Sequence, residues 1–259
     1  YLEYIKNGFE PNTVKLLKIL SSRSNISLDI GANIGCTSLL LSSTSKKVYS
    51  FEPSPTTYQF LETNVRNSKR DNIFTLNQGI GDIESSLNLS FSPNNRSGGF
   101  IGDLKSSTLI TESVKINRLD DIQDKFEKKI DFIKIDVEGF EENVLKGAKE
   151  TLLKNKPTLL IELNHWCLNA FQRTSIPDFF DMLRSTFPFV FVVEGDNYLS
   201  LHDTDETFLV MYHHIINQKF QDIVACYDLN SLEEFFKEYK KGFVAKKEIS
   251  FEREAYESN

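Results

Sequence analysis

Short apolar runs alternate with segments of helical spacing along most of the chain. Five runs rich in Ile, Leu, Val and Phe have the length of buried strands: 26–30, 47–52, 73–80, 132–136 and 158–162. The segments between them at 36–44, 55–67 and 141–153 carry apolar residues at helical spacing. Strands that alternate with helices build a mostly parallel sheet. The pattern therefore predicts an α/β fold with helices on both faces of the sheet.

The two ends of the chain extend this pattern. The segment 11–22 opens with a proline and predicts a helix that covers one end of the sheet. A helix is also predicted at 176–186, followed by apolar runs at 189–193 and 207–212. Turn-forming residues lie between these two runs, which predicts an antiparallel pair. We therefore expect a seven-stranded, mostly parallel sheet with an antiparallel edge strand.

One region interrupts the alternation of strands and helices. Within residues 83–118, apolar and polar residues alternate at 87–91 and again at 107–116, as in antiparallel strands. The polar stretch 92–99 between them predicts a loop. We interpret the region as a β insertion over the ligand-binding edge of the sheet, with a mobile loop that acts as a lid.

The composition suggests how the chain is divided. We expect an N-terminal helical segment at 1–25, a nucleotide-binding α/β domain at 26–215 that includes the insertion 83–118, and a C-terminal helical extension at 216–259. Hydrophobic residues make up 40% of the chain and charged residues 26%, as in soluble globular proteins. No apolar stretch approaches twenty residues, so we expect no transmembrane segment.

The net charge bears on nucleic-acid binding, and the cysteine pattern bears on the redox state of the thiols. The formal net charge of −7 argues against nucleic acid, because binding to a phosphate backbone relies on an excess of Lys and Arg. The three cysteines are Cys36, Cys167 and Cys226, which are widely spaced and form no C-x-x-C pair. This pattern predicts reduced thiols in a cytoplasmic protein rather than a disulfide framework.

Candidate chemistry begins in the turn after the first strand. Asp29-Ile30-Gly31-Ala32-Asn33-Ile34-Gly35 is followed by a helical segment, a second strand and Glu52. Nucleotide-binding α/β domains place a carboxylate about 20 residues after such a turn, where it binds the ribose hydroxyls. The order of strand, glycine turn, helix, strand and acid therefore predicts an adenosine-type ligand.

The turn differs from the dinucleotide fingerprint. The pattern G-x-G-x-x-G requires glycine at the position of Asn33, where the backbone approaches a pyrophosphate. Asp29 would repel phosphate and attract an ammonium or sulfonium group, although it could equally cap the turn. S-adenosylmethionine combines a ribose with a cationic amino-acid end and has no phosphate. The residues favour this methyl donor over NAD.

Several motifs in fixed order resemble the FkbM-type methyltransferases. They are D-I-G-A-N-I-G at 29–35, F-E-P-S-P at 51–55, Leu61-x-x-Asn64, G-D at 81–82, K-I-D-V-E-G-F-E at 134–141, Leu145-Lys146-Gly147-Ala148 and P-T-L-L-I-E at 157–162. The resemblance implies a Rossmann-like class I methyltransferase fold that uses S-adenosyl-L-methionine. Members of this family mostly methylate hydroxyls of sugars, polysaccharides or polyketide-type natural products.

The resemblance also implies positions for the cofactor. By position, the methionine end would be lined by Asp29, Gly31, Asn33 and Gly35, while Glu52, followed by Pro53, would bind the ribose hydroxyls. Asp82, next to Gly81, would reach the adenine amino group, unless it only forms a turn. Asp136 would close the pocket at the end of its strand.

A sugar hydroxyl is a poor nucleophile, so a base or a metal should assist the transfer. His165 is the candidate base, with Asp136 and Glu138 as further candidates, although His165 could instead be a partly buried residue beside Trp166. A weaker hypothesis is a divalent metal, Mg²⁺ or Mn²⁺, held by Asp136, Glu162 and Asn164.

Two other functions are compatible with the fold. An NAD-type oxidoreductase would share the Rossmann-like sheet, but Asn33 argues against it. A non-catalytic binding module would have no need to keep Asp29 and Glu52 together. The main hypothesis is thus an S-adenosylmethionine-dependent O-methyltransferase that acts on a small-molecule or glycan acceptor. The identity of the acceptor and the oligomeric state stay open.

Overall fold

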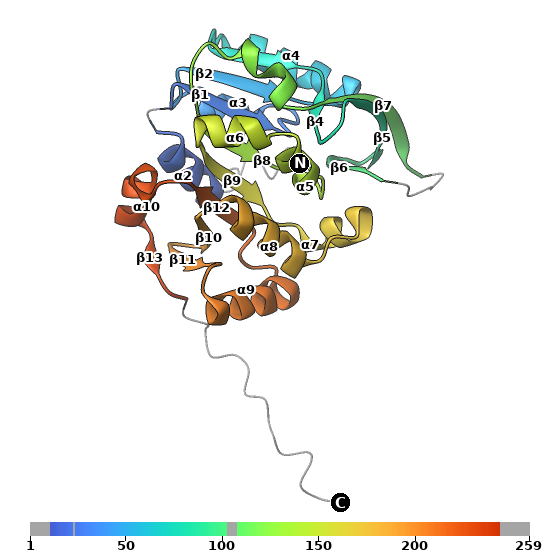
Figure 1. Cartoon of the computed structure of the whole chain (residues 1–259). Coiled ribbons are helices and arrows are strands. Elements are labelled where there is room, and N and C mark those ends of the chain that lie inside the picture. Colours follow the sequence, from blue (N-terminus) through green and yellow to red (C-terminus); the bar gives the residue numbers. More distant parts are fainter. Residues whose placement is uncertain (1–10, 23, 103–107, 244–259) are drawn as a thin grey trace, which may run out of the picture.

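The computed structural model of the protein describes residues 11–22, 24–102 and 108–243. Within these residues, nine strands form a central sheet in the order β13-β11-β10-β12-β9-β8-β1-β2-β3 (Figure 1). A second, four-stranded sheet has the order β4-β7-β5-β6. The predicted α/β, Rossmann-like class with helices on both faces is confirmed, whereas the predicted count of seven strands is wrong.

Five parallel strands form the half of the central sheet that carries the candidate site. They are β3 (Ile73–Leu76), β2 (Lys47–Phe51), β1 (Ile26–Ile30), β8 (Ile130–Ile135) and β9 (Thr158–Glu162). Every residue of β1 is buried, as expected for a strand covered by helices on both faces. Because these strands are parallel, their carboxyl ends meet at one edge, where open α/β sheets bind ligands.

The other half of the sheet contains the antiparallel strands. Strand β12 (Asp222–Cys226) lies between β9 and β10 (Phe189–Glu194) and is antiparallel to both. Strand β11 (Asn197–Ser200) pairs with β10, and β13 (Lys240–Lys241) pairs with β11. Antiparallel strands therefore lie at the edge of the sheet, where β11 and β13 run, and β12 is a further antiparallel strand inside it. It comes from a part of the chain for which we expected only helix.

The run 207–212, predicted to be a strand, lies in the helix α9 (Thr204–Asn217). Asp203 caps this helix, because its side chain accepts a hydrogen bond from the Glu206 N–H. The buried residues Thr207, Val210 and His214 follow a helical spacing. A short apolar run such as 207–212 fits either a strand or a helix. The Asp203 cap and the helical spacing of the buried residues show that it is a helix.

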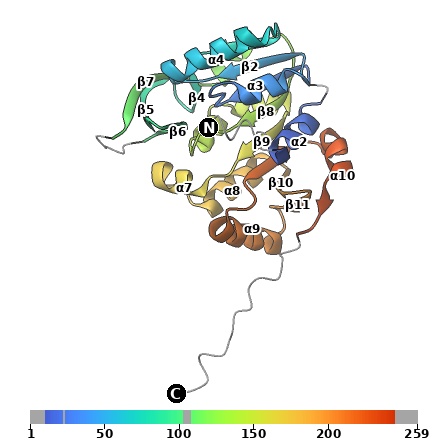
Figure 2. The same ribbon diagram turned by 180° about the vertical axis from the view of Figure 1, so that it is seen from behind.

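Helices cover both faces of the sheet (Figures 1 and 2). One face packs against α5 (Glu141–Lys146), α6 (Lys149–Asn155), α8 (Ile176–Thr186) and α9. The other packs against α2 (Pro11–Leu20), α3 (Cys36–Leu41) and α10 (Glu233–Glu238). Helix α4 (Pro55–Ser68) runs beside β2 and β3. Shorter turns are η1 (Asp120–Lys125), α7 (His165–Cys167), η2 (Leu168–Gln172) and η3 (Leu229–Leu232).

A close backbone contact breaks the helix predicted at 141–153 into α5 and α6. A Cβ atom at Gly147 would lie 1.8 Å from the carbonyl oxygen of Gly81, so only glycine fits at the break. The Gly147 carbonyl oxygen accepts a hydrogen bond from the Asp120 N–H rather than from the next turn of helix. The break thus lets the end of β4 approach the helices under the sheet.

The region 83–118, which we interpreted as a β insertion, contains three strands among its described residues, and its interior differs from the expectation. It contains β5 (Ser85–Ser92), β6 (Asn95–Ile101) and β7 (Ile110–Asn117), and β7 pairs with β4 (Gly79–Ile80). The predicted strand 73–80 therefore splits between two sheets. Most of the predicted loop 92–99 belongs to β6. Residues 103–107 lie outside the described residues.

Two further observations concern membrane-spanning helices and disulfides. No helix among the described residues is long and apolar enough to cross a membrane. Cys36, Cys167 and Cys226 all lie in the described part of the chain, and none of them forms a disulfide.

Candidate active site

A cavity of about 550 Å³ lies at the carboxyl edge of the central sheet. Its walls include the turn after β1, the ends of β2, β8 and β9, and part of β6 from the insertion. The predicted site residues that line it are Gly31, Asn33, Glu52, Pro53, Asp136, Glu138 and Glu162. The structure therefore brings together residues that the sequence distributes over more than a hundred positions.

The turn after β1 lies against the end of β8. Gly31 has a left-handed φ of 87°, and a Cβ atom there would lie 1.8 Å from the Asp136 carbonyl oxygen. Asn33 is also left-handed, with a φ of 49°, a conformation that asparagine tolerates better than most residues. The N–H groups of Gly31 and Ala32 both donate to the Phe51 carbonyl oxygen. The turn is thus fixed by backbone contacts to β2 and β8.

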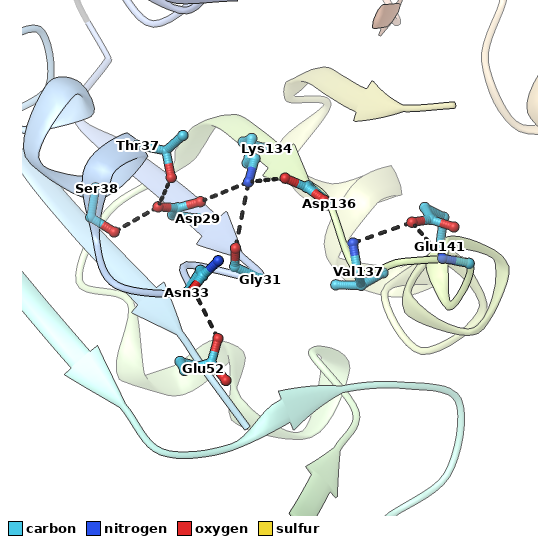
Figure 3. Close-up of polar contacts among 11 residues, drawn as sticks. Asp29, Gly31, Asn33, Thr37, Ser38, Glu52, Lys134, Asp136, Val137 and Glu141 are labelled. Atoms are coloured by element: carbon cyan, nitrogen blue, oxygen red, sulfur yellow. Dashed lines mark hydrogen bonds and ion pairs between the residues drawn. The ribbon is translucent and has the colours of Figure 1, made fainter. Parts of the chain in front are cut away.

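Glu52 is held at the end of β2 with its carboxylate fixed. One oxygen, Oε2, accepts a hydrogen bond from the Asn33 N–H at 3.0 Å (Figure 3). The other, Oε1, accepts one from the Ser54 N–H at 2.8 Å. Burial raises the pKa of Glu52 to about 7, although these two hydrogen bonds oppose the shift. Each oxygen keeps a lone pair for a hydroxyl donor in the cavity.

A buried lysine connects two of the predicted acids. Lys134 Nζ lies 2.9 Å from Asp136 Oδ2, 3.7 Å from Asp29 Oδ1 and 3.5 Å from the Gly31 carbonyl oxygen (Figure 3). Burial alone would lower the pKa of Lys134, but the charges of Asp136 and Asp29 raise it above the ordinary value. The ammonium group is therefore charged and holds the first turn and the end of β8 together.

Asp29 lies beneath the cavity rather than in its wall. It is fully buried, and its Oδ2 accepts hydrogen bonds from the Thr37 and Ser38 hydroxyls of α3. Its other oxygen faces Lys134. In this arrangement, Asp29 interacts with Lys134 and with the hydroxyls of α3, and a ligand in the cavity would contact Gly31 rather than Asp29.

Three carboxyl groups gather where β8 and β9 end. Asp136 and Glu162 share a hydrogen bond, and the negative charge of Asp136, with burial, raises the pKa of Glu162 well above its ordinary value. Burial opposes ionisation of Asp136, but Lys134 and the hydrogen bond from Glu162 lower its pKa. Burial and then the charge of Asp136 raise the pKa of Glu138. Asp136 is thus the ionised member of its pair with Glu162, and Glu162 holds the shared proton.

Besides Asp29, three predicted cofactor residues do not line the cavity. Gly35 has a φ of 95° before α3, and a Cβ atom there would lie 2.7 Å from Leu61. Gly81 is packed against Ile116 and Phe140, next to the partly exposed Asp82. The predicted contact of Asp82 with an adenine amino group stays a prediction.

His165 and Asn164 are placed away from the cavity wall. The His165 ring packs edge-on against His214, with the ring centres 4.9 Å apart. Asn164 Oδ1 accepts a hydrogen bond from the Cys167 N–H, and its Nδ2 donates to Glu138 Oε2 at 3.1 Å. The proposed metal ligands Asp136, Glu162 and Asn164 therefore do not converge. No group of three or more His, Cys, Asp or Glu side chains that could hold a metal ion occurs among the described residues.

Sequence reasoning did not predict the roles of three charged residues in or near the site. Lys134 stands between apolar neighbours in β8, and a lysine inside a buried strand could have signalled an ion pair. Arg96 of β6 lines the cavity, donates to the Thr56 hydroxyl at 2.7 Å and stacks on Phe91. Glu141, the first residue of α5, is buried beside Asp136.

Comparison with known proteins agrees with this geometry. Residues 29–190 match the Methyltransferase FkbM domain. The chain belongs to this family. The matched range begins at Asp29 and includes every residue of the cavity that we assigned from the sequence. Membership of a methyltransferase family argues against the alternative of an NAD-type oxidoreductase.

Two relatives and one crystal structure illustrate the similarity. Hexuronic acid methyltransferase AglP of Haloferax volcanii is 31% identical over 144 residues, which are 55% of this chain and 58% of that protein. Methyltransferase sdnD of Sordaria araneosa is 28% identical over 155 residues, 48% of this chain and 60% of that protein. The chain thus spans about three-fifths of the length of these relatives.

The crystal structure of Methyltransferase FkbM from Methylobacillus flagellatus KT superposes with a TM-score of 0.51 at 20% identity. The superposition covers 79% of this chain and 44% of that one. At this identity, the similarity concerns the fold, and it agrees with the predicted Rossmann-like methyltransferase fold.

Proposed function

We propose that the protein is an S-adenosylmethionine-dependent methyltransferase that methylates a hydroxyl group of a sugar, polysaccharide or related natural product. The observation that carries this proposal is the Glu52 carboxylate, fixed by two backbone N–H groups at the cavity wall. Such a carboxylate accepts hydrogen bonds from the two hydroxyls of a ribose. Family membership supplies the reaction type.

The residues present fit the cofactor. The cavity volume of about 550 Å³ lies in the range of ligand pockets. Gly31 leaves the floor of the cavity open where a side chain would collide with β8. Glu52 would hold the ribose, and Gly31, Asn33 and Asp136 would surround the methionine end. The negative charge of Asp136 suits a cationic amino-acid group.

The proposed chemistry is an in-line displacement. When bound, S-adenosylmethionine supplies an electrophilic methyl group on a positively charged sulfur. The acceptor oxygen would form a bond to the methyl carbon as the carbon–sulfur bond breaks, the sulfur would keep the electron pair and leave as S-adenosylhomocysteine, and the hydroxyl proton would pass to a base. Asp136 is the residue best placed to take that proton, because it lines the cavity and Lys134 keeps it ionised. Alignment of the hydroxyl would contribute much of the acceleration.

The acceptor end of the cavity supports a ligand rich in hydroxyl groups. Beyond Glu162, the wall carries Glu194, Gln221 and Asp222 from the ends of β10 and β12. Carboxylate and amide groups bind neighbouring hydroxyls, as sugars offer. The name of the relative AglP, a hexuronic acid methyltransferase, points to the same class of acceptor.

Calorimetry with S-adenosylhomocysteine and with NADH tests the cofactor assignment. We expect binding of the first compound only, weakened about 10- to 100-fold in Glu52→Ala, because hydrogen bonds to a charged group are lost. Glu62→Ala removes an exposed acid of α4 and should bind as the unchanged protein does. Binding of NADH instead would refute the proposal.

Transfer of a radiolabelled methyl group to uronic acids, neutral sugars and nucleotide sugars tests the activity. We expect label in a product that resists base, as an ether does and an ester does not. A protein that binds S-adenosylhomocysteine but transfers no methyl group to these compounds or to a cell extract would support the non-catalytic alternative.

A further inference from the structure

Three aromatic side chains from β6, α7 and η2 pack together beside the cavity. The Phe171 ring stacks on Phe100, with the ring centres 3.8 Å apart and an angle of 2° between the planes. The Trp166 indole packs at 90° against Phe171, with the ring centres 5.3 Å apart. We call these three side chains the aromatic rim. The contacts orient the indole, yet Trp166 stays 62% exposed.

One end of the aromatic rim is attached to the cavity wall through α7. Trp166 precedes Cys167 in this short helix, and Cys167 Sγ donates to Glu138 Oε2 at 3.3 Å. Glu138 lines the cavity. A Cβ atom at Gly139 would lie 2.7 Å from the Cys167 carbonyl oxygen, so α7 packs directly on the turn that carries Glu138. The helix that carries the indole therefore borders the acidic part of the cavity.

The other end of the aromatic rim is attached to a second wall, formed by β6. Gln172 Nε2 donates to the Ile101 carbonyl oxygen at 2.9 Å, and Ile101 lines the cavity. A Cβ atom at Gly102 would lie 3.5 Å from the Phe171 side chain. The helix α7 and the turn η2 lie next to β6 in both views (Figures 1 and 2). A ligand that extends out of the cavity between these two walls would meet the indole.

The exposed indole matches one sugar ring better than a protein surface. An aromatic side chain buries about 150–250 Å², whereas a stable protein complex covers about 800 Å² on each partner. One face of a pyranose ring carries C–H groups that are apolar and slightly positive, and the face of an indole is negative. The acids of the adjoining cavity wall, Asp136, Glu138 and Glu162, disfavour the phosphates of a nucleic-acid strand.

We propose that Trp166 binds a sugar ring of the acceptor next to the ring that is methylated. The inference rests on the proposed function, because it assumes that the cavity holds a hydroxylated acceptor. One ring then occupies the cavity near Asp136, and the neighbouring ring stacks on the indole outside. An indole that is already oriented loses little conformational entropy on binding. The acceptor is thus a glycan of two or more linked rings rather than a free monosaccharide.

Trp166 is the only tryptophan of the chain, so tryptophan fluorescence reports directly on the aromatic rim. The full chain is titrated with cellotetraose and tetragalacturonate, and with glucose and galacturonate as the matched single rings. We expect at least one tetramer to change the tryptophan emission and to bind about 3- to 10-fold more tightly than its monomer, as one added aromatic contact would give. Tetramers that leave the emission unchanged, or monomers that bind as tightly, would overturn the proposal.

Substitutions followed by calorimetry separate stacking from a structural role. Trp166→Ala should lower the affinity for the tetramer to that for the monomer, and Trp166→Phe should keep part of the difference because a ring remains. Phe208→Ala on α9 is the matched control, since Phe208 is 63% exposed outside the aromatic rim. Equal losses for tetramer and monomer in Trp166→Ala would show that the indole only supports α7, and would refute the proposal. So would self-association of the protein that Trp166→Ala abolishes, because the indole would then bind a protein.

Binding of S-adenosylhomocysteine distinguishes a failure of this inference from a failure of the proposed function. If the unchanged protein does not bind this compound, the methyltransferase assignment fails. A preference for the tetramer that Trp166→Ala removes would still assign the aromatic rim to a glycan. If the protein binds the compound but Trp166→Ala leaves the preference intact, only the inference about the aromatic rim fails.

Discussion

Lys134 and Asp29 are direct neighbours in the parallel pairing of β8 with β1, and their charged groups lie 3.7 Å apart. Both side chains are buried, and the same ammonium group binds Asp136 at 2.9 Å. One lysine thus neutralises the acid beneath the glycine turn and the acid at the cavity wall. This arrangement links the stability of the sheet to the charge state of the candidate site.

Replacing Lys134 by methionine should destabilise the protein strongly. Methionine keeps the volume of the side chain, but it leaves Asp29 and Asp136 without their cation, and an unpaired buried charge costs about 3–5 kcal/mol. Urea unfolding of Lys134→Met against the unchanged protein measures the loss. The double variant D29N/K134M should recover at least half of it, because the amide carries no charge. Equal losses in the single and double variants would contradict this account.

Gly31 and Gly195 form a matched pair for testing the turn. Both have positive φ, but a Cβ atom would lie 1.8 Å from a backbone oxygen at Gly31 and would meet nothing within 4 Å at Gly195. Gly31→Ala should therefore cost about 3 kcal/mol or more, from the left-handed backbone together with the collision. Gly195→Ala should cost about 1 kcal/mol. Thermal unfolding compares the two, and similar losses would show that the turn can move away from β8.

Glu141 should make stability depend on pH in the direction opposite to ordinary acid unfolding. Its Oε1 accepts hydrogen bonds from the N–H groups of Val137 and Gly139, Oε2 has no partner, and burial raises the pKa to about 7 from an ordinary value of 4.5. Between these values, the folded protein holds a proton that the unfolded chain releases. The contribution of Glu141 to stability therefore increases as pH falls from 7 to 4.5, by up to ~1.4 kcal/mol per pH unit.

Glu141→Gln measures that contribution. The amide cannot ionise, so the variant should be about 2–3 kcal/mol more stable than the unchanged protein at pH 8 and nearly equal to it at pH 5. Glu142→Gln is the control. Burial opposes its ionisation, but hydrogen bonds from Lys146 and Thr174 lower the pKa of Glu142, so this variant should lose stability at pH 8. A gain for Glu141→Gln that is equal at both pH values would rule out titration as the cause.

The sequence predicted the parallel half of the fold well because its signals are local. Buried strands such as 26–30 and 158–162 are continuous apolar runs, and the helix at 176–186 has a serine cap and a proline in its first turn. The turn from Gly31 and the acid Glu52 follow a spacing that backbone geometry imposes. These parts could be placed without knowledge of what packs against them.

The wrong predictions concern segments whose structure depends on contacts between residues far apart in the sequence. Nothing local shows that 222–226 inserts between β9 and β10, or that 207–212 continues a helix that Asp203 caps. The role of Lys134 depends on the register of β1 with β8, which a single sequence does not reveal. His165 was chosen for its ordinary pKa near neutrality, but α7 places its ring against His214.

Asp136 and His165 are distinguished by the pH dependence of turnover. Because Lys134 and Glu162 lower the pKa of Asp136, a base at this position stays ionised from pH 8 to below pH 6. A histidine base would instead lose activity as pH falls through about 6.5. We therefore expect kcat to stay nearly constant between pH 8 and pH 6.

Substitutions complete this last test. Asp136→Asn should lower kcat by about 100-fold or more, as expected for loss of a base, and should also weaken S-adenosylhomocysteine binding, because the amide carries no negative charge for the amino-acid end. His165→Ala should change kcat by less than about threefold, because its ring is outside the cavity wall. Unfolding measurements on both variants separate a catalytic loss from a folding defect. A large loss in His165→Ala with Asp136→Asn near normal would transfer the role of base back to the histidine, because the proton would then have to leave the cavity toward α7.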